Sequence, residues 1–287
     1  MANIGIIGYG YVGQATGAGF STNKKNKIFW FDKYKESPNT LDKVVSKSEF
    51  IFVCVPTPMF RDYSGSDMSI VNEVADGIAK KIEGTNKILI VKSTVLPGTT
   101  VELAKKYPKV NLAMNPEFLT QKNAGSDFLN PVRTVIGASD KKVSERIKSL
   151  YLSILPKKSR FFLVSTTSAE ISKYMSNLML ASKVLLANEF YFLSKKVSGD
   201  YEEVREIVES DPRVGTFLGV PGWDGDYGFG HACFPKDMLG LLAFARKNKV
   251  DMSALEAVWK KNLKIRKVKE WEKMDNAFGI GASENKN

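Results

Sequence analysis

The stretch Asn-Ile-Gly-Ile-Ile-Gly-Tyr-Gly-Tyr-Val-Gly, residues 3–13, decides how the beginning of this chain folds. Ile4 to Ile7 form a short apolar run, and a G-x-G-x-x-G motif follows it directly, at the start of a helical pattern. Glycines in this spacing allow a tight turn and let the backbone approach a pyrophosphate, which the N-terminus of the next helix attracts. The motif therefore predicts a dinucleotide site that includes Gly8, Gly10, Tyr11, Val12 and Gly13.

Asp32 ends the second apolar run, 19 positions after Gly13. A carboxylate at this place accepts hydrogen bonds from the adenosine ribose and repels a 2'-phosphate, so it favours NAD over NADP. Lys33 and Lys35, which follow at once, weaken that preference because their charges attract phosphate. We expect NAD as the cofactor.

The first half of the chain alternates apolar runs with helical patterns such as Ile70 to Ile82 and Lys142 to Ile154. Runs without polar alternation are typical of strands that are covered on both faces. The pattern predicts an α/β fold, a Rossmann-like doubly wound parallel sheet. The predicted strands are 4–7, 28–31, 51–55, 88–91, 111–114, 134–136 and 161–164.

The pattern changes after Val164, where a stretch from Thr167 to Lys196 contains neither glycine nor proline. Its helical period predicts one long helix that connects to a smaller all-helical domain. Helices of this length often link domains or form subunit interfaces. We expect an NAD-binding domain over residues 1–165, a helical central and dimerisation domain over 166–275, and a tail over 276–287.

The composition and charge of the chain limit the kinds of partner that we expect. The 287 residues carry a formal net charge of +11, but no interleaving of aromatic and basic residues and no recognition-helix motif accompanies it, so we expect no nucleic-acid partner. No signal peptide or apolar stretch of bilayer length is present, which favours a cytoplasmic protein without a membrane partner. The basic run from Lys260 to Lys273, which includes Arg266, is interpreted as a solvated helix face.

Cys54 and Cys233 are the two cysteines, and they lack metal-ligand spacing, so no metal site is expected. Cys233 lies in Gly-Phe-Gly-His-Ala-Cys-Phe-Pro-Lys-Asp, residues 228–237. Pro235 suits the first turn of a helix, which places Cys233 just before that helix, where the helix dipole stabilises a thiolate. The glycines of this loop would let a substrate approach the sulfur. The alternative is a small buried cysteine and an Asp237 that only stabilises the first turn. His231, the single histidine, is interpreted as a structural or surface residue rather than a base.

An ordered set of motifs resembles the UDP-glucose/GDP-mannose dehydrogenase family over nearly the whole chain. Besides the glycine motif and the cysteine loop, the set comprises VCVPTP at 53–58, KSTVLPGT at 92–99, NPEFL at 115–119, NPVRTVIG at 130–137, KYMSN at 173–177, KVLLANE at 183–189 and DPRVG at 211–215.

The resemblance implies an NAD-dependent four-electron oxidation of a nucleotide sugar, UDP-glucose to UDP-glucuronate before others. Cys233 would hold the substrate as a thiohemiacetal and then as a thioester, which water hydrolyses. Lys173 and Asn177 would stabilise the oxyanion, and Asp237 would position a water or hold Lys173. Glu117 would act as general base, with Thr94 orienting water and substrate.

The resemblance also assigns contacts with the cofactor and the sugar. Cofactor contacts fall on Pro56, Thr57 and Thr94. Substrate contacts fall on Glu117, Phe118, Leu119, Lys173, Asn177, Phe229, Gly230, Cys233 and Arg213, the last reaching a neighbouring subunit of a homodimer built through the long helix.

Two departures keep alternatives open. His231 stands where the family usually has glycine, and the family continues into a third domain that helps to bind UDP, whereas this sequence ends at Asn287. A truncated form, a separate chain that supplies this domain, or a more weakly held substrate would each account for the difference. The other hypotheses are a 3-hydroxyacid-type dehydrogenase, which needs no thiol, and a non-catalytic, NAD-binding dimeric relative.

Overall fold

The computed structural model describes residues 1–274 and 278. The chain divides into two compact units. Unit 1 comprises residues 1–57 and 68–173, and unit 2 comprises residues 58–67 and the chain from Tyr174 onward. The predicted division at residues 165 and 166 stays a prediction, and the predicted tail, 276–287, lies outside the described residues except for Phe278.

Unit 1 is built on a seven-stranded sheet with the strand order β2-β1-β3-β4-β5-β6-β7. The predicted α/β class is confirmed, and each predicted strand is present within two residues of its predicted ends. The strands are β1 (Asn3–Ile7), β2 (Lys27–Phe31), β3 (Phe50–Val53), β4 (Ile88–Val91), β5 (Asn111–Met114), β6 (Thr134–Ala138) and β7 (Phe161–Val164).

One strand pair departs from a fully parallel sheet. β5 and β6 are antiparallel, with Ala113 opposite Ala138 and Met114 opposite Gly137, while every other neighbouring pair is parallel. A parallel pair needs a crossover, usually a helix that returns the chain along the sheet. The connection from β5 to β6 contains only the short helices η1 (Gln121–Asn123) and α5 (Ala124–Leu129), so the chain enters β6 in the opposite direction.

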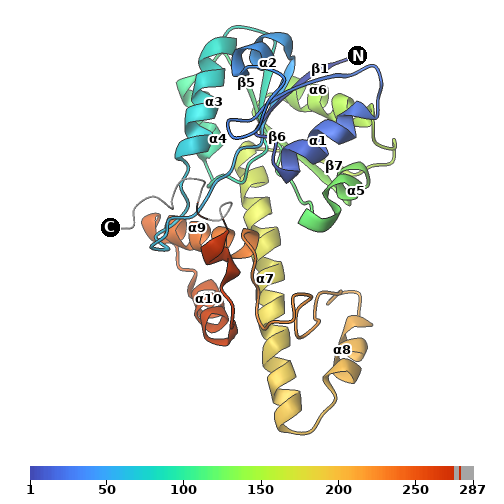
Figure 1. Ribbon diagram of the computed structural model, residues 1–287, viewed down its shortest axis with the longest axis vertical. Helices are drawn as coiled ribbons and strands as arrows, with labels where there is room; N and C mark the ends of the chain where they lie inside the picture. The colour runs from blue at the N-terminus through green and yellow to red at the C-terminus, as the bar shows by residue number, and fades with distance from the viewer. Residues whose placement is uncertain (275–277, 279–287) are drawn as a thin grey trace. The chain divides into compact units, whose positions relative to one another are not determined.

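Helices cover both faces of this sheet (Figure 1). α2 (Leu41–Lys47), α3 (Ser69–Ile82) and α4 (Thr99–Lys106) lie on one face, and α1 (Tyr11–Ser21), α5 and α6 (Lys141–Leu152) lie on the other. Successive residues of β3 therefore enter different hydrophobic clusters: Ile51 and Val53 pack in one, Phe50 and Phe52 in the other. This explains why the strands are continuous apolar runs in the sequence.

The long helix α7 (Thr166–Lys196) begins in unit 1 and continues into unit 2. Its Glu170 is fully buried and accepts hydrogen bonds from the backbone N–H groups of Gly98, at 2.6 Å, and Thr100, at 2.8 Å, and from the Thr100 hydroxyl. Burial raises the pKa of Glu170, although these hydrogen bonds oppose the rise. Gly98, the N-cap of α4, has no side chain of its own to cap the helix, so Glu170 does so from α7.

Unit 2 is helical and contains α8 (Tyr201–Glu209), α9 (Cys233–Lys247), α10 (Ser253–Ile265) and the short η2 (Glu270–Lys273). Its core gathers buried side chains of α7, α9, α10 and η2, among them Leu178, Met238 and Trp271. Residues 58–67 join this unit through buried Met59 and through Ser66, whose hydroxyl would lie 2.2 Å from a Cβ placed on Gly240.

We predict that Glu170→Ala lowers the free energy of unfolding by about 2 kcal/mol, because α4 loses its cap and buried backbone donors lose their acceptor. Urea unfolding followed by circular dichroism measures this. Glu102→Ala, which removes an exposed ion pair with Lys105 on the same helix, is the control and should change stability by less than about 0.5 kcal/mol. Equal effects of the two substitutions would contradict the capping role.

Candidate active site

The predicted dinucleotide motif lies where the strand order reverses, between β1 and β3. Gly8 follows β1 directly and donates its N–H to the carbonyl of Phe31 at the end of β2. It adopts φ +88°, and a Cβ on it would lie 2.7 Å from the carbonyl atoms of Cys54. Only glycine combines this backbone conformation with this close approach to the end of β3.

The other two motif glycines fit a bound pyrophosphate. A Cβ on Gly13 would lie 2.1 Å from the Gly8 carbonyl oxygen, so the turn closes only without a side chain there. Gly10 is the N-cap of α1, and among the described residues a Cβ on it would meet open space. The first turn of α1 contains no acidic side chain that would repel a phosphate. The residues present therefore fit NAD.

Asp32 is held against the glycine turn. Its Oδ2 accepts the N–H of Tyr9 at 2.6 Å, and its Oδ1 accepts the N–H of Tyr34 at 2.9 Å. A hollow of about 470 Å³ beside it is lined by Lys33, Lys35 and Lys43 among others. Lys33 and Lys35, which weaken the preference for NAD, thus line the same hollow as Asp32, the carboxylate that creates this preference.

The other predicted cofactor residues follow neighbouring strands. Pro56 and Thr57 come after β3, and Thr94 comes after β4. Because β1, β3, β4 and β5 are parallel, their carboxyl ends share one edge of the sheet with the glycine turn. Thr57 is buried and Thr94 is half-buried.

Glu117, which follows β5, pairs with Lys173 from the start of α7. The Lys173 Nζ lies 3.0 Å from Glu117 Oε1, and both side chains are buried. Glu117 Oε2 accepts the N–H of Leu119 at 2.6 Å, which orients the carboxylate. The ring of Phe118 lies 5.6 Å from Lys173 Nζ and 4.0 Å from the Arg133 guanidinium. The structure therefore joins the predicted base and one predicted oxyanion residue in unit 1.

A pocket of about 260 Å³ opens beside this pair and is lined by Glu117, Phe118 and Leu119 together with Lys92, Asn115, Arg133 and Tyr151. Lys92 is buried and donates to Asn115 Oδ1, at 3.0 Å, and to the Tyr151 hydroxyl, at 3.3 Å. Burial lowers the pKa of Lys92 to about 8. Sequence reasoning missed Lys92, Arg133 and Tyr151. For Lys92 and Arg133 the only signal was their place in two of the family motifs.

In unit 2, Cys233 is the first residue of α9, with Ala232 as N-cap. The helix begins two residues earlier than Pro235 predicts. Proline is also tolerated at the third position, because the first turn has no intrahelical partner for its N–H groups. The half-buried thiol thus lies at the N-terminus of a 15-residue helix, as the sequence predicts.

Asp237 lies one turn further along α9 and is almost fully buried. Its Oδ2 accepts a hydrogen bond from Asn177 Nδ2 at 2.6 Å, and its Oδ1 lies 2.6 Å from Lys236 Nζ. The structure therefore brings together Asn177 and Asp237, which are 60 positions apart. The roles that the resemblance assigns to them stay predictions.

Two residues of the predicted site, Phe229 and Arg213, lie where the sequence could not place them, and so does His231, interpreted from the sequence as a structural or surface residue. Phe229 is buried in the hydrophobic core of unit 2. His231 adopts φ +58° and stacks on Trp223, with 4.6 Å between the ring centroids. The Arg213 side chain is 88% exposed and pairs with Asp211.

Comparisons with known proteins identify the family. The model of the UDP-glucose/GDP-mannose dehydrogenase family NAD binding domain matches residues 31–155, and that of the family's central domain matches residues 167–264. The chain belongs to this family. UDP-glucose 6-dehydrogenase of Rickettsia bellii is 34% identical over 223 residues, which are 76% of this chain and 50% of the relative. That of Pseudomonas aeruginosa is 33% identical over 233 residues, with shares of 78% and 50%.

The fold agrees with this assignment. A UDP-glucose dehydrogenase from Pyrobaculum islandicum superposes with a TM-score of 0.81 at 28% identity, covering 92% of this chain and 68% of that one. The chain spans about half the length of the curated relatives it matches. The match to the NAD-binding domain model begins at residue 31, after the glycine motif. The assignment of that motif to a dinucleotide site therefore rests on its geometry. None of the helices within residues 1–274 combines the length and hydropathy that a bilayer crossing requires.

The lowered pKa of Lys92 predicts a pH-dependent cost. The folded state has a pKa of about 8, against 10.5 ordinarily, so the unfolded chain binds the proton more tightly and wild-type stability rises between these pH values. We expect the stability advantage of Lys92→Met over wild type to shrink by on the order of 3 kcal/mol from pH 7 to pH 10.5. Urea unfolding of both proteins at the two pH values measures it. A difference that does not change with pH would refute the prediction.

Proposed function

We propose that this chain oxidises the C6 primary alcohol of a nucleotide sugar to the carboxylate, with UDP-glucose as the first candidate substrate. The observation that carries the proposal is the placement of Cys233 at the first position of α9, one turn before the buried Asp237 that bonds Asn177. A helix N-terminus lowers the pKa of a thiol and makes it a better nucleophile near neutral pH. The family supplies the class of substrate.

The glycine turn, α1 and Asp32 are the residues that would hold NAD, with Pro56 and Thr57 beside them. Bound NAD supplies the hydride acceptor for two successive two-electron oxidations. The mechanism requires that the thiol of unit 2 and the nicotinamide held by unit 1 reach the same C6 atom.

Cys233 divides the reaction into stages, because the substrate stays covalently bound to its sulfur between the two oxidations. After the alcohol has lost a hydride and a proton, the thiolate adds to the aldehyde carbon and forms a thiohemiacetal. Loss of a second hydride and the hydroxyl proton leaves a thioester. Water then adds to the thioester carbon, and the C–S bond breaks, which releases the carboxylate and regenerates the thiol.

The hydrogen bonds and proton transfers of these stages are assigned to Lys173 and Asn177, and to Glu117 with Thr94. Lys173 and Asn177 donate to the oxygen that becomes negative when the thiolate or water adds. Glu117 accepts the proton of the attacking water, and Thr94 orients that water. The 3.0 Å ion pair between Lys173 and Glu117 supports this division, because it holds the proposed base next to a proposed oxyanion donor.

The alternative dehydrogenase class has weaker support. A 3-hydroxyisobutyrate dehydrogenase of Mycobacterium tuberculosis superposes with a TM-score of 0.73 but at 13% identity, which shows a shared fold alone. A two-electron oxidation of a hydroxyacid gives no use to a thiol at the start of α9. The non-catalytic alternative, an NAD-binding relative, keeps its support from His231.

We predict that the purified protein forms two NADH per UDP-glucuronate when given NAD and UDP-glucose, and that Cys233→Ser lowers the rate by at least about 10³-fold. Absorbance at 340 nm follows NADH, and mass spectrometry of wild type should detect an acyl adduct on Cys233. Cys54→Ser should still make UDP-glucuronate, because burial raises the pKa of the Cys54 thiol to about 12 and leaves it unreactive.

Several results would overturn this proposal. NAD binding by calorimetry without NADH from any nucleotide sugar would favour the non-catalytic relative. Oxidation of a small hydroxyacid that survives Cys233→Ala would favour the hydroxyacid class. Activity that appears only when the part of a relative that this chain does not match is added as a separate chain would overturn activity of this chain alone, and would support the expectation that another chain helps to hold the nucleotide.

We further propose that α7 pairs with α7 of a second copy. One face of α7 carries Met175, Met179, Leu186, Phe190 and Leu193, each more than half exposed. Their spacing of three, four or seven puts them in one stripe about 27 Å long. A neighbouring face of α7, with Leu178 and Leu185, is buried in unit 2, so the exposed stripe is additional to what the core needs.

We predict that the wild-type protein sediments as a dimer and that Phe190→Glu weakens the dimer at least about tenfold, because a charge would have to be buried in an apolar interface. Sedimentation velocity over a concentration series measures this. Val250→Glu, which alters an exposed apolar residue beyond α9, is the control and should leave the dimer intact. A monomeric wild type at tens of micromolar, on the order of a weak interface's Kd, would reject the pairing.

A further inference from the structure

The loop that leads into α9 is held from outside by side chains of distant segments. Asn262 on α10 accepts the Phe229 N–H at 2.8 Å and donates to the Phe229 carbonyl at 2.9 Å. Asn188 on α7 accepts the N–H of Gly228 at 3.1 Å, and Glu270 on η2 accepts the N–H of His231 at 2.6 Å. Three helical segments, α7, α10 and η2, thus bind the backbone of residues 228–231.

The loop glycines fit these side chains. A Cβ on Gly228 would lie 2.2 Å from Asn262 Oδ1, and one on Gly230 would lie 1.9 Å from Glu270 Oε1 and 2.3 Å from Arg266 Nη2. The space beside both glycines is therefore filled by the holding residues. Protein atoms thus occupy the space that a side chain at either position would need, and the expectation that these glycines let a substrate approach the sulfur stays a prediction.

Arg266 connects the holding residues to one another. It is buried, and its Nη2 lies 2.6 Å from both Asp224 Oδ2 and Glu270 Oε1, while its Nη1 donates to the Tyr227 carbonyl at 3.3 Å. Burial alone would lower the pKa of Arg266, but the hydrogen bonds to the two carboxylates raise it. The interpretation of Arg266 as part of a solvated helix face is therefore wrong.

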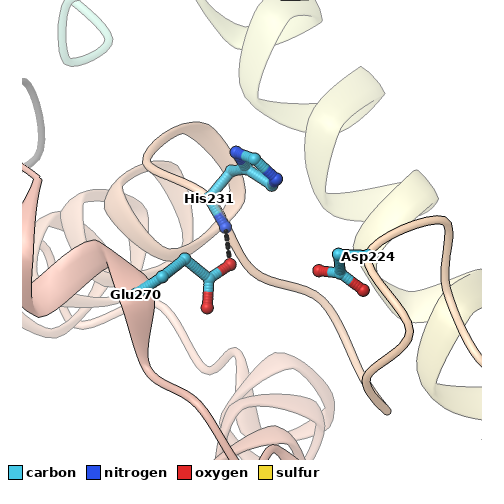
Figure 2. Close-up of side chains that lie close together, drawn as sticks. All are labelled: Asp224, His231 and Glu270. Carbon is cyan, nitrogen blue, oxygen red and sulfur yellow. Dashed lines mark hydrogen bonds between the residues drawn. The ribbon is translucent and has the colours of Figure 1, made fainter.

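A metal site is the competing interpretation of this region. Asp224, His231 and Glu270, shown in Figure 2, have ligand atoms within 4.8 Å of one another. Arg266 already bonds both carboxylates, so a cation would have to be placed beside a buried guanidinium. The dashed bond in Figure 2 joins Glu270 to the backbone of His231 rather than to its ring. The cluster holds the loop.

We infer that Asn262, Arg266 and Glu270 are positioning residues for Cys233. Only Ala232 lies between His231, whose N–H is bonded, and Cys233, and His231 itself adopts φ +58°, so these bonds determine how the chain enters α9. The bonds thus hold the residues that lead into the first turn of α9, whose N-terminal N–H groups stabilise a thiolate at Cys233. The inference rests on the proposed function only because that function uses the thiolate as a nucleophile.

The test measures the thiolate itself, without substrate. The intact protein is alkylated with iodoacetamide over a range of pH, and the rate at Cys233 is read from its peptide by mass spectrometry, with buried Cys54 in the same sample as an internal reference. We expect an apparent pKa of Cys233 below the ordinary value of about 8.5 in wild type. Glu270→Ala should raise it by about one unit, an approximately tenfold slower alkylation at pH 7.

Glu270→Gln is the conservative variant, because its amide oxygen still accepts the His231 N–H, and it should keep the wild-type profile. Arg266→Lys should shift the profile, since an ammonium cannot make the same set of bonds. Lys264→Ala removes a positive charge from an exposed place on α10 and should leave the profile unchanged. Thermal unfolding of each variant establishes that it is folded at the assay temperature.

The outcomes separate this inference from the proposed function. A shifted wild-type profile that a folded Glu270→Ala leaves unchanged overturns the positioning role alone. A wild-type profile with an ordinary thiol pKa overturns both. A profile that moves in Glu270→Ala and not in Glu270→Gln supports positioning, even when no nucleotide sugar yields NADH. Asn262→Ala, which loses both bonds to Phe229, gives a second folded variant should Glu270→Ala unfold.

Discussion

Unit 1 depends on one constraint: β1, β3, β4 and β5 run parallel, so their carboxyl ends meet at one edge of the sheet. The glycine turn, Thr57, Thr94 and Glu117 each follow one of these strands and therefore share that edge. Gly8 can sit between the ends of β2 and β3 only because it lacks a side chain. The candidate dinucleotide site is thus a consequence of strand direction, with glycine as the local requirement.

Buried charge is arranged in pairs throughout the molecule. Glu117 with Lys173 and Arg266 with two carboxylates have a partner of opposite sign, while Glu170 is stabilised by backbone N–H groups at the end of α4. Lys92 differs, since its described hydrogen bonds go to neutral oxygens, and its pKa falls accordingly. Burying an ion is costly unless such partners are supplied, and the pairs Glu117 with Lys173 and Asp224 with Arg266 also join segments that are far apart in sequence.

α7 links the features that define function. Glu170 and Lys173 near its start belong to unit 1, Asn177 bonds the Asp237 of α9, and Asn188 holds the cysteine loop. Its exposed apolar stripe runs along the same helix. A helix of 31 residues thus carries buried polar groups and an exposed apolar stripe at once.

The sequence by itself determined the α/β class, the seven strands, the long helix, the glycine turn and the place of Cys233 at a helix start. These follow from short-range patterns: apolar runs, helical period, and the turn and capping preferences of glycine and proline. Tertiary structure alone decided the antiparallel β6, the burial of Arg266, the partners of Lys92 and the pairing of Asn177 with Asp237. Such features depend on which distant side chains meet, and a basic run on a helix has the same local pattern whether water or a carboxylate surrounds each charge.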